Sequence, residues 1–155
     1  MALEPAQLSA ACAEAMWAGD RASRGLGMRI EEIGPGRAVL SMEVREDMVN
    51  GHAICHGGMI FTLADSAFAF ACNSYNLSAV AAGARVDFIA PGRLGDRLTA
   101  VAEKVTQGRR SGVYDVAVRN QDDRLIALFR GNSQRIGGEL VNLSLIHISE
   151  PTRLN

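Results

Sequence analysis

The sequence predicts an α+β domain in which an antiparallel sheet wraps around one long, central helix. The run from Gly57 to Tyr75 is apolar on nearly every side, as in a helix that is buried on most of its surface. Six shorter segments have strand character, and turn residues join them through connections short enough for antiparallel neighbours. Strands both precede and follow the long helix, so we expect them to form one sheet around it.

The individual elements follow from local patterns along the chain. Apolar residues recur at spacings of three and four from about Pro5 to Ala18, which predicts a short amphipathic helix. Two strands, at 27–33 and 37–44, flank a Gly34-Pro-Gly36 turn and should form a hairpin. A loop at 47–55 leads into the long helix. Four further strands are expected at 79–89, 97–106, 112–120 and 125–136.

Length and composition indicate a single folded domain. The chain has 155 residues and is 48% hydrophobic, which suffices for one ordinary core. We expect this domain at residues 1–138, followed by a tail at 139–155. Residues 144–153, which include His147, resemble translated vector or adapter sequence, so we expect no functional role for them.

Charge and cysteine content limit the classes of partner. The 16 Lys and Arg residues balance 17 Asp and Glu residues, so the net charge of −1 gives no bulk attraction to nucleic acid or membrane. An anionic ligand would need a local basic patch. The three cysteines, Cys12, Cys55 and Cys72, are odd in number and lack CxxC spacing. They favour a reducing compartment, and we expect the cytoplasm.

A polar loop runs directly into the long helix between Asn50 and Asp65. Gly57 and Gly58 stand at the helix start, where free N–H groups and the helix dipole suit an oxygen that gains negative charge. The same two glycines also fit a tight turn into the helix. Asp65 has no Lys or Arg three or four residues away. It is a candidate nucleophile or base for acyl transfer; the alternative is a buried Asp satisfied by donors across the sheet.

The loop also holds side chains of the types that bind zinc. His52, Cys55 and His56 lie close together in the sequence, but no fourth ligand follows at a recognisable spacing. The CxxCH pattern of haem attachment is absent. We therefore expect no metal site.

Motifs spread over residues 25–138 match one known family together. A His-Gly-Gly tripeptide at 56–58 is weak by itself, but here an Asp follows Gly57 by eight residues and an Asn precedes His56 by six. The other matching segments are 50–52, 63–74, 87–92, 112–115 and 127–131. In these motifs the chain resembles the hotdog-fold acyl-CoA thioesterases, and among them the thioesterases of phenylacetate degradation.

The resemblance implies a hotdog fold whose subunits join edge to edge, with active sites at their interface. It also implies a homo-oligomer, often a tetramer made of two dimers. The substrates would be aromatic acyl-CoA thioesters, such as phenylacetyl or hydroxyphenylacetyl, or medium-chain ones, cleaved to free acid and coenzyme A. No separate cofactor is implied, since coenzyme A is part of the substrate and product. A non-catalytic acyl-CoA sensor on the same fold is the alternative, although no DNA-binding segment is recognisable.

The resemblance also assigns roles around the helix start. Asp65 would attack the thioester carbonyl or activate a water, and the Gly57 N–H would donate to the carbonyl oxygen while Gly58 permits close approach. His56 would order the loop with its ring near the thioester. Asn50 would orient the attacking water or the Asp65 carboxylate. Local sequence supports a simple turn role for Asn50 equally well.

Two further expectations concern the rest of the substrate site. The phosphates of coenzyme A need a basic patch, and the candidates are Arg93, Arg109, Arg110, Arg130 and Arg135. Each of these arginines also fits a solvated surface position. Some related thioesterases carry a Ser or Thr in the strand after the helix to place water, but residues 80–84 here contain no hydroxyl. Asn50 would then place the water, or Asp65 would act as a nucleophile.

Overall fold

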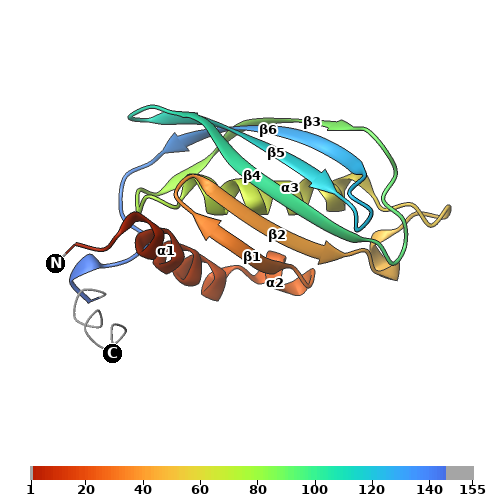
Figure 1. The fold of residues 1–155 in the computed structure, drawn as a ribbon, viewed down its shortest axis with the longest axis horizontal. Helices are drawn as coiled ribbons and strands as arrows, with labels where there is room; N and C mark the ends of the chain where they lie inside the picture. Colours follow the sequence, from red (N-terminus) through yellow and green to blue (C-terminus); the bar gives the residue numbers. More distant parts are fainter. Residues whose placement is uncertain (1, 146–155) are drawn as a thin grey trace.

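The sheet of this protein curves around one central helix. The structure, a computed structural model, describes residues 2–145. Six antiparallel strands lie in the order β1-β2-β4-β5-β6-β3. Figure 1 shows this sheet wrapping α3 (Gly57–Cys72), which confirms the predicted fold. The strands are β1 (Arg29–Gly34), β2 (Arg37–Glu43), β3 (Ala79–Phe88), β4 (Arg97–Gln107), β5 (Ser111–Arg119) and β6 (Leu125–Arg135).

The observed strand boundaries lie within two residues of the predicted ones. The largest difference is the start of β1, because Gly27 adopts a φ of 72° that is incompatible with a strand. At the β1–β2 turn, Gly36 has a φ of 69°, and a Cβ there would lie 2.6 Å from the Tyr75 hydroxyl oxygen. Only glycine fits this turn without movement. Two short helices were not predicted: α2 (Arg21–Gly25) and η1 (Glu46–Met48).

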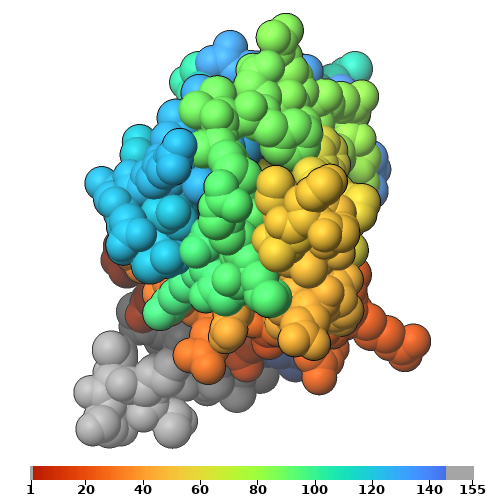
Figure 2. All heavy atoms as spheres, turned by 90° about the vertical axis from the view of Figure 1, so that its right-hand side faces the viewer, coloured from red at the N-terminus to blue at the C-terminus, as the bar shows by residue number. Residues whose placement is uncertain are grey.

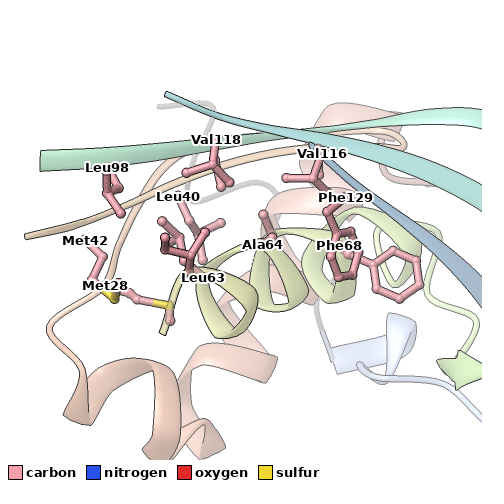
Figure 3. Close-up of a cluster of buried hydrophobic side chains, with 14 of the residues drawn as sticks. Met28, Leu40, Met42, Leu63, Ala64, Phe68, Leu98, Val116, Val118 and Phe129 are labelled. Carbon is pink, nitrogen blue, oxygen red and sulfur yellow. The ribbon is translucent and has the colours of Figure 1, made fainter. Parts of the chain in front are cut away.

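The sheet-facing side of α3 forms the centre of the core. Leu63, Ala64 and Phe68 point from the helix toward Val116 and Val118 of β5, and all five are almost fully buried (Figure 3). Side chains at every second position of the strand thus contact helix side chains that share one side of α3 because of the 3.6-residue helical period. This packing fixes the rotation of α3 about its axis, and with it the direction of every other side chain on the helix.

The predicted helix boundary at Tyr75 is wrong, because α3 ends at Cys72. The Asn73 side-chain amide donates to the Ala69 carbonyl at 2.9 Å and to the Ala79 carbonyl at 3.1 Å. Its oxygen accepts from the Ala79 N–H at 2.8 Å. These bonds connect the last helical turn directly to the first residue of β3. A polar side chain that competes with the helical backbone bonds ends the helix here.

The expectation that α3 is buried nearly all round is also wrong. One line of residues is only partly buried or exposed, at spacings of three and four that place it on one side of the helix. We call this line the open stripe of α3; it consists of Gly58, Thr62, Asp65 and Ala69. The catalytic candidate Asp65 therefore faces outward from the helix and not into the core of its own chain.

A different side of α3 is covered by the N-terminal helices, α1 (Pro5–Gly19) and α2. The Trp17 ring packs against Phe70 with centroids 6.3 Å apart. The Ser23 and Ser66 hydroxyl oxygens form a hydrogen bond of 2.8 Å. With the sheet and α1–α2 on its other sides, α3 leaves the open stripe and its first turn uncovered within residues 2–145.

The strand β3 lies at a free edge of the sheet. It pairs with β6 on one side and with no strand among residues 2–145 on the other. Most of its residues are exposed, including Val80 and Phe88, and residues 79–84 are nearly all small. A long, unpaired apolar edge of this kind is a template for pairing with another chain.

Hydrogen bonds of the domain extend past the expected boundary at residue 138. The side-chain oxygen of Asn76 accepts from the N–H groups of Leu140 and Val141, each at 2.9 Å. Residues 139–141 are thus held against the turn between α3 and β3. The vector-like part of the tail beyond residue 145 lies outside the described residues. None of the helices in the described range is long and apolar enough to span a membrane.

Candidate active site

The loop before α3 is held firmly against the segment between β3 and β4. The Cys55 N–H donates to the Gly92 carbonyl at 2.8 Å, and the Leu94 N–H donates to the Ala53 carbonyl at 3.2 Å. Figure 2, which faces the end where α3 begins, shows these two segments side by side in gold and green. Ala53 has a φ of 59°, which is unfavourable for a residue with a Cβ. The loop is therefore fixed in one conformation in front of the helix.

Asn50 organises this loop through its side-chain oxygen. That oxygen accepts from the N–H groups of His52 at 2.9 Å and Ile54 at 3.2 Å. These two hydrogen bonds are typical of a turn, which is the role that the local sequence supports for Asn50. The side-chain NH₂ of Asn50, however, has no hydrogen-bond acceptor among residues 2–145, so it remains free to donate to a ligand.

The start of α3 presents free backbone donors. His56 is the N-cap residue, its side chain is exposed and it makes no capping hydrogen bond. The N–H groups of Gly57 and Gly58 have no acceptor within the helix, and no loop carbonyl in the described part of the chain accepts from them. They point outward at the positive end of the helix dipole. A developing oxyanion would be stabilised at this position.

An apolar cavity of about 440 Å³ opens beside these donors. The ring of Phe88, 54% exposed, covers Gly57 so closely that a Cβ at position 57 would lie 2.8 Å from the ring. The cavity is lined by Ile54, Cys55, Gly57, Ile60, Phe88, Ile89, Ala90, Pro91 and Gly92. An apolar chain carrying a polarised carbonyl fits such a surface.

Phe88 is a site residue that the sequence argument missed. It was recognised only as part of the 87–92 motif, without a role. The usable signal was the position of an aromatic residue at the end of the strand that leads into the loop 89–96. The contact itself depends on how β3 pairs with β6, which the sequence does not reveal.

Asp65 combines burial with the absence of a partner. Burial raises the pKa of its carboxyl above the usual value for Asp. No hydrogen bond or ion pair involves this carboxyl within residues 2–145. A half-buried carboxylate without a partner is costly for a structural residue, whereas a general base with a raised pKa gains in basicity.

Gly57 and Asp65 of one chain do not meet at one point. Eight residues of helix separate them, which corresponds to about 12 Å along the axis at 1.5 Å per residue. A thioester carbonyl bound at the Gly57 N–H is therefore out of reach of Asp65 on the same helix. The structure of a single chain brings together Asn50, His56, Gly57 and Gly58, but not Asp65 with them.

The candidate arginines lie in three separate places. Arg93 is exposed and pairs through its backbone with Ile54 in the loop before α3. Arg109 and Arg110 are exposed at the tip of the β4–β5 hairpin. Because β4 starts beside that loop and runs away for eleven residues, this tip lies at the opposite end of the domain. Arg135 is partly buried and donates to the carbonyls of Gly108 and Arg109 at 3.3 and 3.2 Å.

Arg130 faces away from α3. It makes a two-pronged ion pair with Asp115, with N–O distances of 2.6 and 2.8 Å, on the outer face of the sheet. The hollow around this pair has a volume of about 540 Å³. Its charged lining residues are Arg85, Asp87, Glu103, Asp115 and Arg130, so carboxylates outnumber guanidinium groups. This surface does not favour a phosphate.

The zinc-type side chains of the loop do not form a cluster. Within the described residues, no three His, Cys, Asp or Glu side chains are placed to hold a metal ion together. Burial, with Asp96 nearby, raises the pKa of the Cys55 thiol to about 11. The thiolate form that binds metals is therefore scarce at neutral pH.

Comparisons with known proteins identify the family of the chain. A family model described as the thioesterase superfamily matches residues 52–127. The acyl-coenzyme A thioesterase PaaI of Escherichia coli (strain K12) is 49% identical over 128 residues, which span 83% of this chain and 91% of that protein.

Solved structures also show similarity to thioesterases. The structure of the E. coli PaaI protein from the phenylacetic acid degradation operon superposes with a TM-score of 0.87 and 46% identity, covering 88% of this chain and 99% of that one. A hypothetical thioesterase from Streptococcus pneumoniae TIGR4, solved with coenzyme A, superposes with a TM-score of 0.70 and 29% identity, covering 72% and 88%. The chain therefore belongs to the thioesterase superfamily, as a thioester hydrolase of the hotdog-fold acyl-CoA thioesterase family.

Proposed function

We propose that this protein hydrolyses aromatic acyl-CoA thioesters of the phenylacetyl or hydroxyphenylacetyl type, or medium-chain ones, to the free acid and coenzyme A. The observation that carries the proposal is the unpartnered, half-buried carboxyl of Asp65 on the open stripe of a helix that begins with two free N–H donors. The E. coli relative is named an acyl-coenzyme A thioesterase, and its solved structure is described as that of a protein from the phenylacetic acid degradation operon. The S. pneumoniae relative was solved with coenzyme A.

The proposed chemistry uses only the thioester and water. An oxygen nucleophile attacks the carbonyl carbon, the C–S bond breaks, and the sulfur of coenzyme A leaves and takes up a proton. The Gly57 N–H donates to the carbonyl oxygen as it becomes negative, with Gly58 leaving room for its approach. His56 orders the loop beside the thioester. Asp65 acts as the base for a water or as the nucleophile itself.

We further propose that each active site contains two subunits. The 12 Å between Gly57 and Asp65 is bridged if the Gly57 end of a second, antiparallel α3 lies beside Asp65 on the open stripe. The free edge of β3 supports this arrangement, because pairing β3 with its copy joins two sheets and brings the two helices together. Two such dimers would form the tetramer. The free, buried cysteines, Cys12, Cys55 and Cys72, are consistent with the cytoplasm.

The direct test is release of free thiol from a panel of coenzyme A thioesters: phenylacetyl, hydroxyphenylacetyl, benzoyl, octanoyl and acetyl. Phenylacetyl-, hydroxyphenylacetyl- or octanoyl-CoA should have the highest kcat/KM. Fast turnover of acetyl-CoA alone would contradict the proposed substrate class. Binding of the thioesters without turnover would support the sensor alternative.

Substitution of Asn50 separates its two roles. Asn50→Asp keeps the side-chain oxygen that accepts from His52 and Ile54 but removes the NH₂ donor. We expect kcat to fall roughly 100-fold while the free energy of unfolding stays unchanged, because one oriented donor is lost from the site. Asn50→Ala should in addition lower the free energy of unfolding by about 1 kcal/mol, measured by urea titration, since two loop N–H groups lose their acceptor. Full activity of Asn50→Asp would leave Asn50 with the turn role alone.

Charge reversal tests the arginines. We propose that Arg93, Arg109 and Arg110 hold the phosphates, with the hairpin tip serving the site whose Gly57 belongs to the other subunit. Arg109→Glu combined with Arg110→Glu should raise KM at least about tenfold and leave kcat nearly unchanged, because a phosphate contact binds substrate and transition state equally. Arg124→Glu, an exposed arginine on another turn, is the matched control. Arg130→Gln should leave KM unchanged, given its ion pair with Asp115.

A further inference from the structure

Thr62 is the only hydroxyl on the open stripe of α3 within the described residues. It lies three residues before Asp65, so the two side chains are neighbours on the same side of the helix, about 4.5 Å apart along its axis. Both side chains are partly exposed. Ser66, the other hydroxyl close to Asp65 in sequence, points to α2 and bonds to Ser23 at 2.8 Å. Thr62 and Asp65 are thus left side by side, facing the proposed substrate site.

The hydroxyl of Thr62 has a fixed direction. It donates to the Gly58 carbonyl at 2.8 Å, one helical turn earlier. A threonine hydroxyl has a single hydrogen and two lone pairs. Because that hydrogen is committed to the helix backbone, the oxygen can only accept a further hydrogen bond. Next to the Asp65 carboxylate, it forms the second of two neighbouring acceptors.

Two acceptors at this spacing suit one water molecule. Neighbouring side chains at i and i+3 have Cβ atoms about 5–6 Å apart, close enough for one water to hydrogen-bond to an oxygen atom of each. A water that donates one hydrogen to Asp65 and the other to Thr62 has both its lone pairs directed away from the helix, toward the thioester carbon. The strand that supplies a hydroxyl in some related enzymes has none here at 80–84.

We propose that Thr62 is a positioning residue, which holds the attacking water together with Asp65. This inference rests on the proposed thioesterase reaction and assigns Asp65 the role of general base. The water oxygen forms the new bond to the carbonyl carbon, its proton passes to the Asp65 carboxylate, and the C–S bond breaks. The proton is then transferred to the departing sulfur, which gives the free acid and coenzyme A as the thiol.

The test compares substitutions of Thr62 that differ in a single property. Thr62→Val keeps the shape but removes the acceptor, and we expect kcat to fall roughly 100-fold with little change in KM, because the water loses its orientation. Thr62→Ser restores an acceptor and should retain most of the activity. The midpoints of thermal unfolding should be similar for all variants. Thr106→Val, an exposed hydroxyl on β4, is the matched control and should behave as the wild type.

Two results would overturn the inference. If Thr62→Val keeps kcat within about twofold of the wild type, the hydroxyl does not position the water. If Thr62→Ser is as impaired as Thr62→Val, the role is one of shape and not of hydrogen bonding. Asp65→Asn is assayed in parallel to separate this inference from the proposed function. A wild-type rate in Asp65→Asn refutes the proposed reaction, whereas an inactive Asp65→Asn with a fully active Thr62→Val refutes only the role of Thr62.

Hydrolysis of the wild type in ¹⁸O-labelled water gives an independent readout. Attack by a water held between Thr62 and Asp65 places the label only in the free acid. Label found in the Asp65 carboxyl after a single turnover would show nucleophilic attack by Asp65, which contradicts the inference and leaves the thioesterase function intact.

Discussion

Asp65→Asn should lower kcat by roughly 1,000-fold or more while thioester binding survives. The substitution is nearly isosteric, so the cavity beside Gly57 and the packing of α3 should not change. What it removes is the proton acceptor or nucleophile, whose contribution typically spans about 10²–10⁴ in rate. Thiol release measures kcat, and equilibrium binding of a non-hydrolysable thioether analogue measures affinity. Asp122→Asn, on an exposed turn, is the matched control. Equal turnover in Asp65→Asn and the wild type would mean that another residue performs the chemistry.

The same substitution should stabilise the fold at neutral pH. Burial raises the pKa of Asp65, so the folded protein holds this proton more tightly than the unfolded chain does. The free energy of unfolding therefore falls as the pH rises from the unfolded pKa, about 4, through the higher folded pKa. Asp65→Asn removes this cost. Its thermal midpoint should exceed that of the wild type at pH 7, and the difference should vanish below about pH 4.

The pH dependence of catalysis follows from the same shift. Asp65 must be ionised to act as base or nucleophile, so the acid limb of kcat/KM should lie above the ordinary pKa of an Asp. An acid limb at the ordinary value would show that burial does not tune this carboxyl in the assembled enzyme.

Mixing two strongly impaired variants should restore activity. Asp65→Asn removes the carboxylate from one half of each proposed site, and Asn50→Asp removes a donor from the other half. If each site takes one half from each subunit, a mixed dimer has one intact site and one doubly defective site. Random pairing of equal amounts makes half the dimers mixed, so about a quarter of the wild-type activity should return. Co-refolding from urea followed by the thiol-release assay measures this.

The matched control pairs Asp65→Asn with Asp65→Ala, which change the same half of the site. This mixture has no intact site in any dimer and should stay inactive. If the Asp65→Asn and Asn50→Asp mixture also stays inactive although mixed dimers form, each site lies within one chain, and the two-subunit arrangement is refuted.

The sequence predicted the fold closely because its signals are local. Alternating polarity marks strands, and Gly34-Pro-Gly36 can only turn, so boundaries agreed within two residues. The end of α3 was missed because the predicted helix was extended past Cys72, where the apolar residues stop, over the polar pair Asn73-Ser74 to Tyr75. The capping bonds of the Asn73 side chain end the helix before that point. The open stripe was missed because Thr62 and Asp65 are few among apolar neighbours, and the apolar composition of the helix as a whole indicates burial without saying which chain provides it.

The candidate site was predictable in part. The loop and helix start carry a contiguous motif, and the structure places Asn50 in the fixed loop that leads directly to His56, Gly57 and Gly58 at the helix start. The position of Arg130 depends on which face of β6 it occupies. Alternation along that strand places it opposite the buried Phe129, on the outer face of the sheet. The contact of the Phe88 ring with Gly57 depends on how β3 pairs with β6, which only the three-dimensional structure shows.

The 12 Å between Gly57 and Asp65 also has a consequence for how activity depends on protein concentration. In the proposed arrangement a lone chain has two incomplete halves, so activity is governed by mass action between chains. Specific activity should then drop on dilution below the dissociation constant of the dimer, where the total rate rises with the square of chain concentration and the rate per chain rises in proportion to it. A newly synthesised chain would not hydrolyse coenzyme A thioesters until it associates with a second copy.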